Sequence, residues 1–495
     1  MLGRAALERR VHCSRSREEG STGRVHVYAF SDRRLPGSGG HLRTRDLSSA
    51  EERRAAGKRL REKTPRDAHA EWRPPAKRLD PIALLRAADA ARVPQLVPIR
   101  YGRMLASPFT FYRGSAAVMA ADLAYTPATG VDVQACGDAH LLNFGGFATP
   151  ERELIFDIND FDETAPAAWE WDVKRLAASF VLAARSNGLP ESAGRAAAAA
   201  CAASYRKRIH EYAEMTVLDI WYARVDSQGF LDRLPSDRQE LIRKRIARAR
   251  AGSSSELVFP KLAEVVDGKP RIHDDPPLIF HHELMHEEGF MDMAHATLAQ
   301  YRATLERSRR ALFDRYKLAD VAVKVVGIGS VGTLCMVCLF IGIEGHPLFL
   351  QVKEAGPSAL ESYAGKSAYA HGGQRVVEGQ RLMQPASDIF LGWMTGPAGR
   401  QFYLRQLRDV KLSVPVETYD TETLEIYAGL CGWVLARAHS KAGDPWTIAG
   451  YLGKSDEFDL AIRKFAVDYA DQAERDHNAL KGAVRSGAVE VILDR

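Results

Sequence analysis

Two polar motifs that lie far apart in the chain constrain its fold more than any other feature. The first is GDAHLLN at residues 137–143, followed by the acidic segment DFD at residues 160–162. The second is GIGSVG at residues 327–332, followed by a strand-like run that ends at Lys353. Carboxylate and amide oxygens hold divalent cations, and glycine-rich backbone can approach phosphate groups closely. The two motifs therefore predict one phosphate-binding site whose acidic part precedes its glycine-rich part.

The glycine-rich motif is predicted to connect two strands. Residues 321–328, 333–343 and 348–353 are rich in β-branched and other apolar residues, which is typical of consecutive strands. A Rossmann-type dinucleotide site needs a helix directly after its glycine loop, so this context argues against such a site. We expect instead a flexible glycine flap over a nucleotide, formed by Gly327, Gly329, Ser330 and Gly332.

Lys353 ends the third of these strands, where its ammonium group is expected to contact the α and β phosphates of the nucleotide. A carboxylate is needed to orient this ammonium group. Glu378, in a helix expected at residues 374–383, is the first candidate for that carboxylate, and Glu361 is the second.

The first motif carries the residues expected to do chemistry. Asp138 and Asn143 are separated by four residues, and Asp138 is expected to accept or orient the proton of an acceptor hydroxyl group. His140 lies between them, and we expect Asp138, His140 and Lys353 to be the catalytic residues. A hard cation such as Mg²⁺ prefers oxygen ligands. The expected ligands are Asn143, Asp160 and Asp162, with Asp157 as a close alternative.

These motifs resemble those of known phosphotransferases. The pattern from Gly137 to Asn143 is similar to the catalytic signature of aminoglycoside phosphotransferases and choline kinases, although Cys136 stands where those families usually have a histidine. The DFD segment resembles their metal-binding motif. Asp172 resembles the residue at a helix start that supports their catalytic loop. The resemblance implies ATP and Mg²⁺ as cofactors and a hydroxyl compound as acceptor.

The order of the motifs implies a rearranged fold. In protein-kinase-like enzymes the glycine loop and the lysine precede the catalytic aspartate, whereas here they follow it. We therefore expect an α+β, protein-kinase-like two-lobe fold that is circularly permuted. Residues 402–411 would form the hinge strand and linker, and residues 423–439 the long helix that ordinarily leads into the catalytic loop.

Over a longer stretch, from about Lys58 to Ala483, the chain resembles an uncharacterised bacterial family, domain of unknown function 2252. The resemblance rests on segments distributed along the whole stretch, among them RYGRMLASPFTFYRG, GDAHLLNFG, FDINDFDE, WEWDVKRLAAS, KVVGIGSVGT, GQRVVEGQRLMQ and LARAHSKAGD. This family brings no established substrate.

Composition suggests four segments. Residues 1–57 are rich in arginine and poor in large apolar residues, and we expect a disordered basic tail there. The other expected segments are a helical catalytic-loop lobe (58–318), a β-rich nucleotide-binding lobe (319–411) and a second helical part (412–495).

The remaining composition predicts a cytoplasmic protein. The six cysteines are scattered, and no apolar secretory leader is seen at the N-terminus. Residues 325–343 carry no charge, but their glycines and β-branched residues favour two buried strands over a membrane span. We expect a nucleotide and a small-molecule acceptor as partners and neither nucleic acid nor membrane. The sequence does not set the oligomeric state.

Two other functions compete with this hypothesis. HELMH at residues 282–286 matches the HExxH zinc-protease pattern, in which two histidines share one face of a helix and Glu283 activates water, with Glu306 as a possible third ligand. The second alternative is a pseudokinase that binds a nucleotide without turning it over.

Overall fold

The computed structural model describes residues 48–232, 236–251, 255–407, 411–412 and 414–493. Residues 1–47 of the expected tail lie outside the described residues. The rest of that segment differs from the expectation, because helix α1 (Ala50–Lys63) begins within it. Ser49 and Glu52 form a capping box at its start, and Arg53 pairs with Asp444 at 3.0 Å. The arginines that suggested disorder thus dock this helix onto the C-terminal part of the chain.

A six-stranded antiparallel sheet contains the expected lysine strand, with the order β11-β12-β10-β9-β8-β7. It contains the three consecutive strands expected from the sequence, which are confirmed with shifted ends. Its strands are β7 (Ile279–Phe280), β8 (Tyr316–Lys324), β9 (Cys335–Gly342), β10 (Pro347–Glu354), β11 (Gly392–Thr395) and β12 (Gln401–Gln406). The glycine-rich segment is the loop between β8 and β9.

Several helices surround this sheet. Helix α15 (Gly372–Met383) packs on β11 and β12, and α12 (Phe290–Thr304) packs on β11. Helix α11 (Ser255–Leu262) lies against β10, and the hairpin of β5 (Ala263–Val266) and β6 (Lys269–Ile272) lies against β8. Helix α13 (Arg307–Phe313) packs on α12. The main contacts of α8 (Val217–Tyr222), α9 (Ser227–Leu231), α10 (Ser236–Ala251) and α14 (Glu361–Ala364) are with elements outside this sheet.

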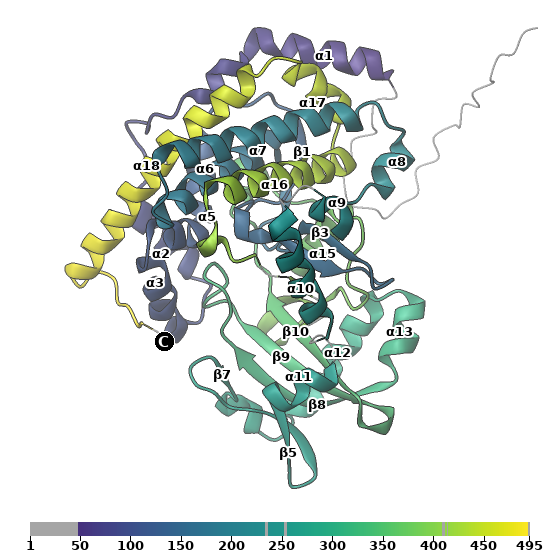
Figure 1. The fold of residues 1–495 in the computed structure, drawn as a ribbon. Coiled ribbons are helices and arrows are strands. Elements are labelled where there is room, and N and C mark those ends of the chain that lie inside the picture. Colours follow the sequence, from purple (N-terminus) through teal and green to yellow (C-terminus); the bar gives the residue numbers. More distant parts are fainter. Residues whose placement is uncertain (1–47, 233–235, 252–254, 408–410, 413, 494–495) are drawn as a thin grey trace, which may run out of the picture. The chain divides into compact units, whose positions relative to one another are not determined.

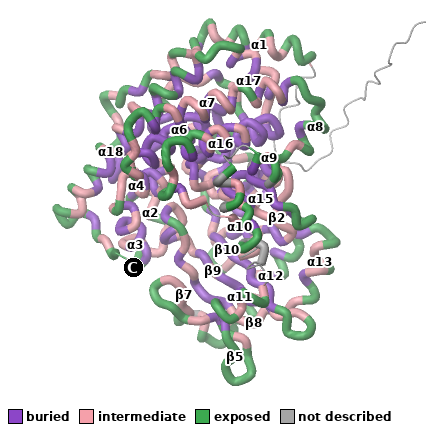
Figure 2. Tube along the Cα trace, in the orientation of Figure 1, coloured by how far each residue is buried: buried purple, intermediate pink, exposed green. Residues whose placement is uncertain are grey.

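The expected first and second helical segments share one hydrophobic core. Helix α16 (Thr421–Ala442) packs on α7 (Glu191–Tyr212) and α6 (Trp169–Ser186), and α18 (Glu457–Arg485) packs on the same pair. Figure 1 shows α6, α7 and α16 side by side, and Figure 2 shows buried residues concentrated along them. Helix α17 (Pro445–Leu452) lies against α1. The helical body is therefore completed only by the last part of the chain.

Four short strands hold the acidic motifs. Strand β1 (Asp132–Ala135) pairs with β4 (Ala165–Ala168), and β2 (Phe144–Ala148) pairs with β3 (Leu154–Ile158) and with β13 (Lys411–Leu412). The GDAHLLN turn connects β1 to β2, and the acidic segment connects β3 to β4. The backbone N–H of Asn159 donates to the carbonyl of Asn143 at 2.8 Å, so the two turns lie side by side. Three residues of the expected hinge, 408–410, lie outside the described residues.

The N-terminal helices α2 (Pro81–Asp89), α3 (Val97–Leu105), α4 (Pro108–Gly114) and α5 (Ala116–Leu123) complete this part of the fold. Among the described residues, no helix is long and apolar enough to cross a membrane.

The contact between α16 and α7 depends on one glycine. A Cβ atom on Gly432 would overlap the carbonyl oxygen of Cys201, whereas a Cβ on Gly429, in the same helix, meets no atom within 4 Å. We predict that Gly432→Ala destabilises the protein by about 1–3 kcal/mol through overpacking. Gly429→Ala should be neutral or stabilise by up to about 1 kcal/mol, because alanine has the higher helix propensity.

Denaturant unfolding of the two variants beside the wild type measures this difference. Equal midpoints for the two alanine variants would show that α16 and α7 are not in backbone contact at Gly432.

Candidate active site

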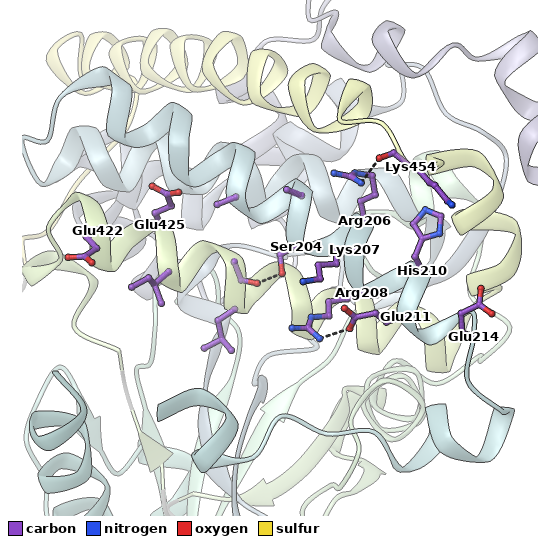
Figure 3. A pocket seen from close by; sticks show the side chains of 15 residues that line it. Ser204, Arg206, Lys207, Arg208, His210, Glu211, Glu214, Glu422, Glu425 and Lys454 are labelled. Atoms are coloured by element: carbon purple, nitrogen blue, oxygen red, sulfur yellow. Dashed lines mark hydrogen bonds and ion pairs between the residues drawn. The ribbon is translucent and has the colours of Figure 1, made fainter. Parts of the chain in front are cut away.

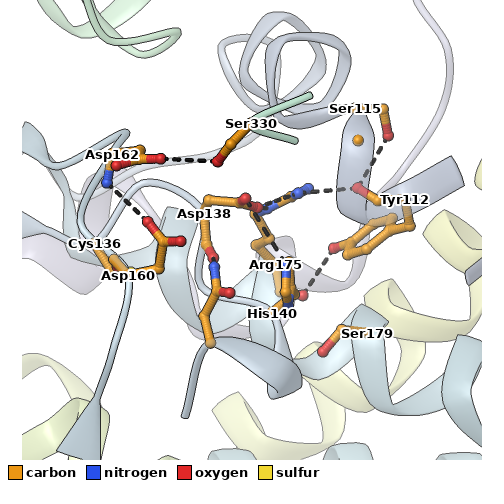
Figure 4. Close-up of polar contacts among 12 residues, drawn as sticks. Tyr112, Ser115, Cys136, Asp138, His140, Asp160, Asp162, Arg175, Ser179 and Ser330 are labelled. Carbon is orange, nitrogen blue, oxygen red and sulfur yellow. Dashed lines mark hydrogen bonds and ion pairs between the residues drawn. The ribbon is translucent and has the colours of Figure 1, made fainter. Parts of the chain in front are cut away.

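The Asp162 carboxylate joins the two distant motifs. Lys353 Nζ lies 2.5 Å from Asp162 Oδ2, and the hydroxyl of Ser330 in the glycine-rich loop donates to the same oxygen at 3.1 Å. The Tyr403 hydroxyl donates to Asp162 Oδ1 at 2.6 Å. Figure 4 shows Ser330 beside Asp162, with Asp160 and Asp138 on the adjoining turns. The acidic segment, the glycine-rich loop, β10 and β12 therefore meet at one carboxylate.

Asp160 is a second carboxylate near the same lysine. Its Oδ2 atom is 3.8 Å from Lys353 Nζ, and its Oδ1 atom accepts the backbone N–H of Asp162 at 3.1 Å. Burial raises the pKa of Asp160, and the negative charge of Asp162 raises it further. Burial alone would also raise the pKa of Asp162, but the charge and hydrogen bond of Lys353 and the hydrogen bond of Tyr403 lower it to about 2. One ammonium group thus balances two neighbouring carboxylates.

The register of the sheet explains why Lys353 points to this place. Lys353 pairs with Cys335 on β9 and with Tyr403 on β12, so the three side chains share one sheet face. Only 2% of Lys353 is exposed, and its ammonium group lies 5.6 Å from the centre of the Tyr403 ring. Arg405, two residues after Tyr403 on the same face, donates to the carbonyl of Asn159 at 3.1 Å. This sheet face therefore supplies cations to the acidic turn.

Asp138 is held by a buried arginine of α6. Arg175 donates to Asp138 Oδ1 from Nε at 2.7 Å and from a second guanidinium nitrogen, and to the carbonyl of Tyr112 at 3.0 Å. The side-chain amide of Asn143 donates to the Asp138 carbonyl at 2.8 Å. Figure 4 shows Asp138, Arg175 and Tyr112 in this network. The position of Asp138 is therefore fixed by groups from both α6 and its own loop.

His140 lies beside Asp138 but is neutral. Its Nε2 atom is 3.9 Å from Asp138 Oδ2, and 4% of the residue is exposed. Burial lowers the pKa of His140 to about 3, because the charge of Asp138 only partly offsets the loss of water and the nearby arginines add to the effect. The ring is therefore uncharged at neutral pH, and the imidazolium form is not available there as a general acid.

Asp172 fixes the backbone of the loop. Its carboxylate accepts the backbone N–H groups of Cys136 at 2.6 Å and Gly137 at 3.0 Å, and it contacts His439 Nε2 at 3.2 Å. Gly137 has a φ of +83°, and a Cβ atom there would overlap the carbonyl oxygen of Glu163. Asp172 thus occupies the supporting position that the resemblance implied, and glycine is required beside it.

The oxygen donors at the acidic turn suit a hard cation. Asp160 and Asp162 offer two neighbouring carboxylates, and the Asn143 turn lies directly against them. The described part of the chain contains no group of three or more His, Cys, Asp or Glu side chains that could hold a metal ion. Mg²⁺ fits this donor set, because it is usually bound through one or two carboxylates and keeps several waters.

Three expected carboxylates lie elsewhere. Glu378 does not pair with Lys353 but with Arg381 at 3.1 Å, one turn along the same helix. Glu361 faces Arg375 at 3.6 Å. Asp157 forms an ion pair with Arg437 at 2.9 Å in which both side chains are fully buried, so it serves the core and not the turn. The partners of Lys353 are therefore Asp160 and Asp162 instead of Glu378 or Glu361.

The N-terminal helices hold the glycine-rich loop, which the sequence analysis did not anticipate. Gly327 and Gly332 have φ values of +67° and +90°. The Arg92 side chain packs on Gly332 and donates to the carbonyl of Val331 at 2.5 Å, and the Val93 N–H donates to the Gly332 carbonyl at 2.7 Å. The loop is therefore placed by residues more than two hundred positions earlier in the chain.

The HExxH segment lacks the local structure that a zinc protease needs. Glu283–His286 is a single turn of 3-10 helix, so His282 and His286 do not lie on one face of an α-helix. Glu306 caps α13. The neighbouring His281 pairs with Asp274 at 2.8 Å and Asp320 at 3.0 Å. His282 and Met285 instead line an apolar cavity of about 630 Å³ between α12 and the sheet.

A larger surface hollow, of about 1170 Å³, lies over α7 and α16 (Figure 3). Two of its arginines are engaged locally, since Arg208 pairs with Glu211 and Arg206 donates to the carbonyl of Lys454 at 3.1 Å. The Ser204 hydroxyl donates to the Gly429 carbonyl at 2.6 Å. None of the site residues described above lines this hollow.

One family model matches most of the chain. The model of the DUF2252 family, described as an uncharacterized protein conserved in bacteria, matches residues 92–483. The chain belongs to this family. The matched residues include the GDAHLLN turn, the acidic segment and the glycine-rich loop, so the DUF2252 region contains the whole candidate site. No curated protein and no solved structure matches the chain.

The charge balance around Lys353 predicts a pH-dependent stability loss on its removal. The pKa of Asp162 is depressed, so in the wild type its stabilising contribution is present above its unfolded-state pKa, roughly 3.9, and is lost as the pH falls toward about 2. In Lys353→Met both carboxylates lose their nearest cation, and only the more distant charge of Arg405 remains. We expect a loss of about 3 kcal/mol at pH 7, the lower end for a broken buried pair. The loss should shrink toward pH 4, as the unpaired carboxylates take up protons.

Urea unfolding at pH 7 and pH 4 measures this change. Lys464→Met is the matched control, because Lys464 and Asp468 form an exposed pair on α18 and such pairs contribute about 0–1 kcal/mol. A loss that is the same at both pH values would contradict the assignment of Lys353 as the counter-charge of the two carboxylates.

Proposed function

We propose that this protein is an ATP- and Mg²⁺-dependent phosphotransferase that acts on a hydroxyl group of a small molecule. The observation that carries the proposal is the convergence of Ser330, Lys353 and two carboxylates beside Asp138. Phosphoryl transfer needs held phosphates, neutralised charge and a carboxylate near the acceptor hydroxyl, and little covalent chemistry. In the candidate site, the glycine-rich loop and Lys353 would hold the phosphates, a cation on the two carboxylates would neutralise charge, and Asp138 would be the carboxylate near the acceptor.

The element order supports a kinase-like arrangement of the sheet. A glycine-rich loop connects β8 to β9, the lysine lies on the following strand β10, and helix α15 follows in the chain after the one-turn helix α14. Protein kinases place their glycine-rich loop, their strand lysine and the helix after it in the same order. The α+β composition of the fold agrees with this proposal.

A contact between distant segments supports circular permutation. Helix α16 ends at Ala442, and a Cβ atom on the next residue, Gly443, would lie 2.5 Å from Val133 Cγ1 on β1. In an unpermuted kinase-like chain, such a helix would lead into the strand before the catalytic loop. Here the helix end and that strand are neighbours in space without being joined in sequence.

The residues have separate roles in the proposed reaction. Arg175 holds Asp138 Oδ1, so Asp138 Oδ2 is the atom that would accept the hydrogen bond of the acceptor hydroxyl. Asp160, Asp162 and Asn143 would hold Mg²⁺, which neutralises phosphate charge. Lys353 and the glycine-rich loop would contact the phosphates. Asp172 and His439 act through the loop backbone and are positioning residues.

The first test is calorimetric titration of Mg·ATP into the full chain. We expect Asp160→Ala and Lys353→Met each to weaken binding at least about tenfold, equivalent to 1.4 kcal/mol. His282→Ala should bind like the wild type, since His282 lines the apolar cavity and not the site. A folded wild type that binds no Mg·ATP would refute the proposal, and its zinc content would then test the HExxH alternative.

A second measurement separates an enzyme from a nucleotide sensor. Asp138→Asn should keep Mg·ATP binding and lose turnover of the terminal phosphate, measured with a panel of hydroxyl compounds. Binding without turnover in the wild type across the panel would favour the pseudokinase.

A further inference from the structure

Arg113 lies where the glycine-rich loop meets the Asp138 network. It belongs to the last turn of α4, and its carbonyl oxygen would lie 3.4 Å from a Cβ atom on Gly329. The carbonyl of Tyr112, one residue earlier, accepts the guanidinium of Arg175, which also holds Asp138. The end of α4 therefore connects the loop expected over the phosphates to the carboxylate expected at the acceptor.

The charges at this place do not balance. Arg175 already pairs with Asp138, and His140 is neutral. Arg113 adds a second cation, because an arginine stays protonated in proteins. Arg113 is only partly buried, but its Nε atom is buried and has no hydrogen-bond partner. In the described part of the chain, no carboxylate lies within ion-pair distance of Arg113. One positive charge is therefore left without a counter-charge.

Three other arginines of the described structure have carboxylate partners, although the Nε atoms of Arg437 and Arg100 also lack a hydrogen-bond partner. Arg437 pairs with Asp157, Arg100 pairs with Asp89, and Arg78 pairs with both Asp122 and Asp476. Burying a cation costs free energy unless a partner compensates it. For Arg113, burial lowers the pKa and Asp138 only partly offsets this effect. An anionic ligand would supply the missing compensation, as guanidinium groups bind phosphate oxygens through paired hydrogen bonds.

We propose that Arg113, beside the backbone of the glycine-rich loop, forms an oxyanion subsite that binds a tetrahedral phosphate group. The biological role of this subsite rests on the proposed function, but phosphate binding can be tested without it. The phosphate group has two sources: the terminal phosphate of the nucleotide or a phosphate carried by the acceptor. In the second case the acceptor class is a phosphorylated hydroxyl compound.

The subsite is tested first with inorganic phosphate alone, in calorimetric titrations of the full chain without nucleotide. We expect saturable binding by the wild type, a loss of at least tenfold in affinity for Arg113→Gln, and a smaller loss for Arg113→Lys, which keeps the charge without the planar fork. Arg463→Gln is the matched control, because Arg463 is exposed on α18, and it should bind like the wild type.

Wild-type phosphate binding that Arg113→Gln leaves unchanged would overturn the subsite, as would a folded wild type that binds no phosphate. If Arg113→Gln fails to fold, judged by circular dichroism, the Arg113→Lys titration decides in the same way. The phosphate titration and the Mg·ATP titration fail independently, so a false subsite is distinguishable from a false phosphotransferase assignment.

Nucleotide titrations then identify the source of the phosphate. If Arg113→Gln weakens Mg·ATP binding and leaves Mg·ADP binding unchanged, the subsite holds the terminal phosphate of the nucleotide. If both nucleotides bind as in the wild type, and inorganic phosphate still binds the Mg·ATP-loaded wild type but not the loaded variant, the subsite holds the acceptor. Equal weakening of both nucleotides would overturn a specific phosphate subsite at Arg113.

Discussion

The ion pair between Lys353 and Asp162 is the interaction on which the candidate site depends. It joins a strand of the sheet to a turn of the helical body, and Ser330 and Tyr403 reinforce it from the glycine-rich loop and from β12. With 2% of Lys353 exposed, a lysine without these carboxylates would carry a large desolvation cost. The sheet and the acidic turn therefore stabilise each other, because each supplies the counter-charge for the partly or fully buried charges of the other.

A second set of contacts keeps the acidic turns rigid. Asp172 accepts two backbone N–H groups of the loop before Asp138, and His439 contacts the same carboxylate from α16. Arg175 holds the Asp138 side chain from α6. Each supporting group lies on a long helix with a buried face, which is how a scaffold holds reacting groups to within the small tolerances that catalysis requires.

Local sequence patterns predicted the parts of the site that are continuous in the chain. Runs of β-branched residues predicted β8, β9 and β10, and the position of Lys353 at the end of the third run predicted its burial. Motif spacing likewise predicted that Asp138, Asp160 and Asp162 belong together. These signals are local because strand propensity and turn chemistry act over a few residues.

Long-range contacts account for what the sequence did not predict. Helix α1 was hidden by its polar composition, since its arginines find partners in α17 and not in their own helix. The sequence predicts that Glu378 on α15 orients Lys353. The face of α15 toward the acidic turn instead carries Arg375 and Gly379, four residues apart. That spacing places both on one helix face and leaves Glu378 off it. Gly379 was the residue in the sequence that could have indicated this face, because a glycine within a helix allows another segment, here Thr164, to pack closely against it.

The neighbourhood of α16 and β1 has a consequence for how the chain acquires its structure. The GDAHLLN turn is synthesised before α16, the helix that carries His439 and covers α6 and α7. Until α16 is made, the apolar faces of two long helices have no cover. Folding of the first half therefore depends on contacts with α16 and α18, which makes this a fold of long sequence separations and slow completion.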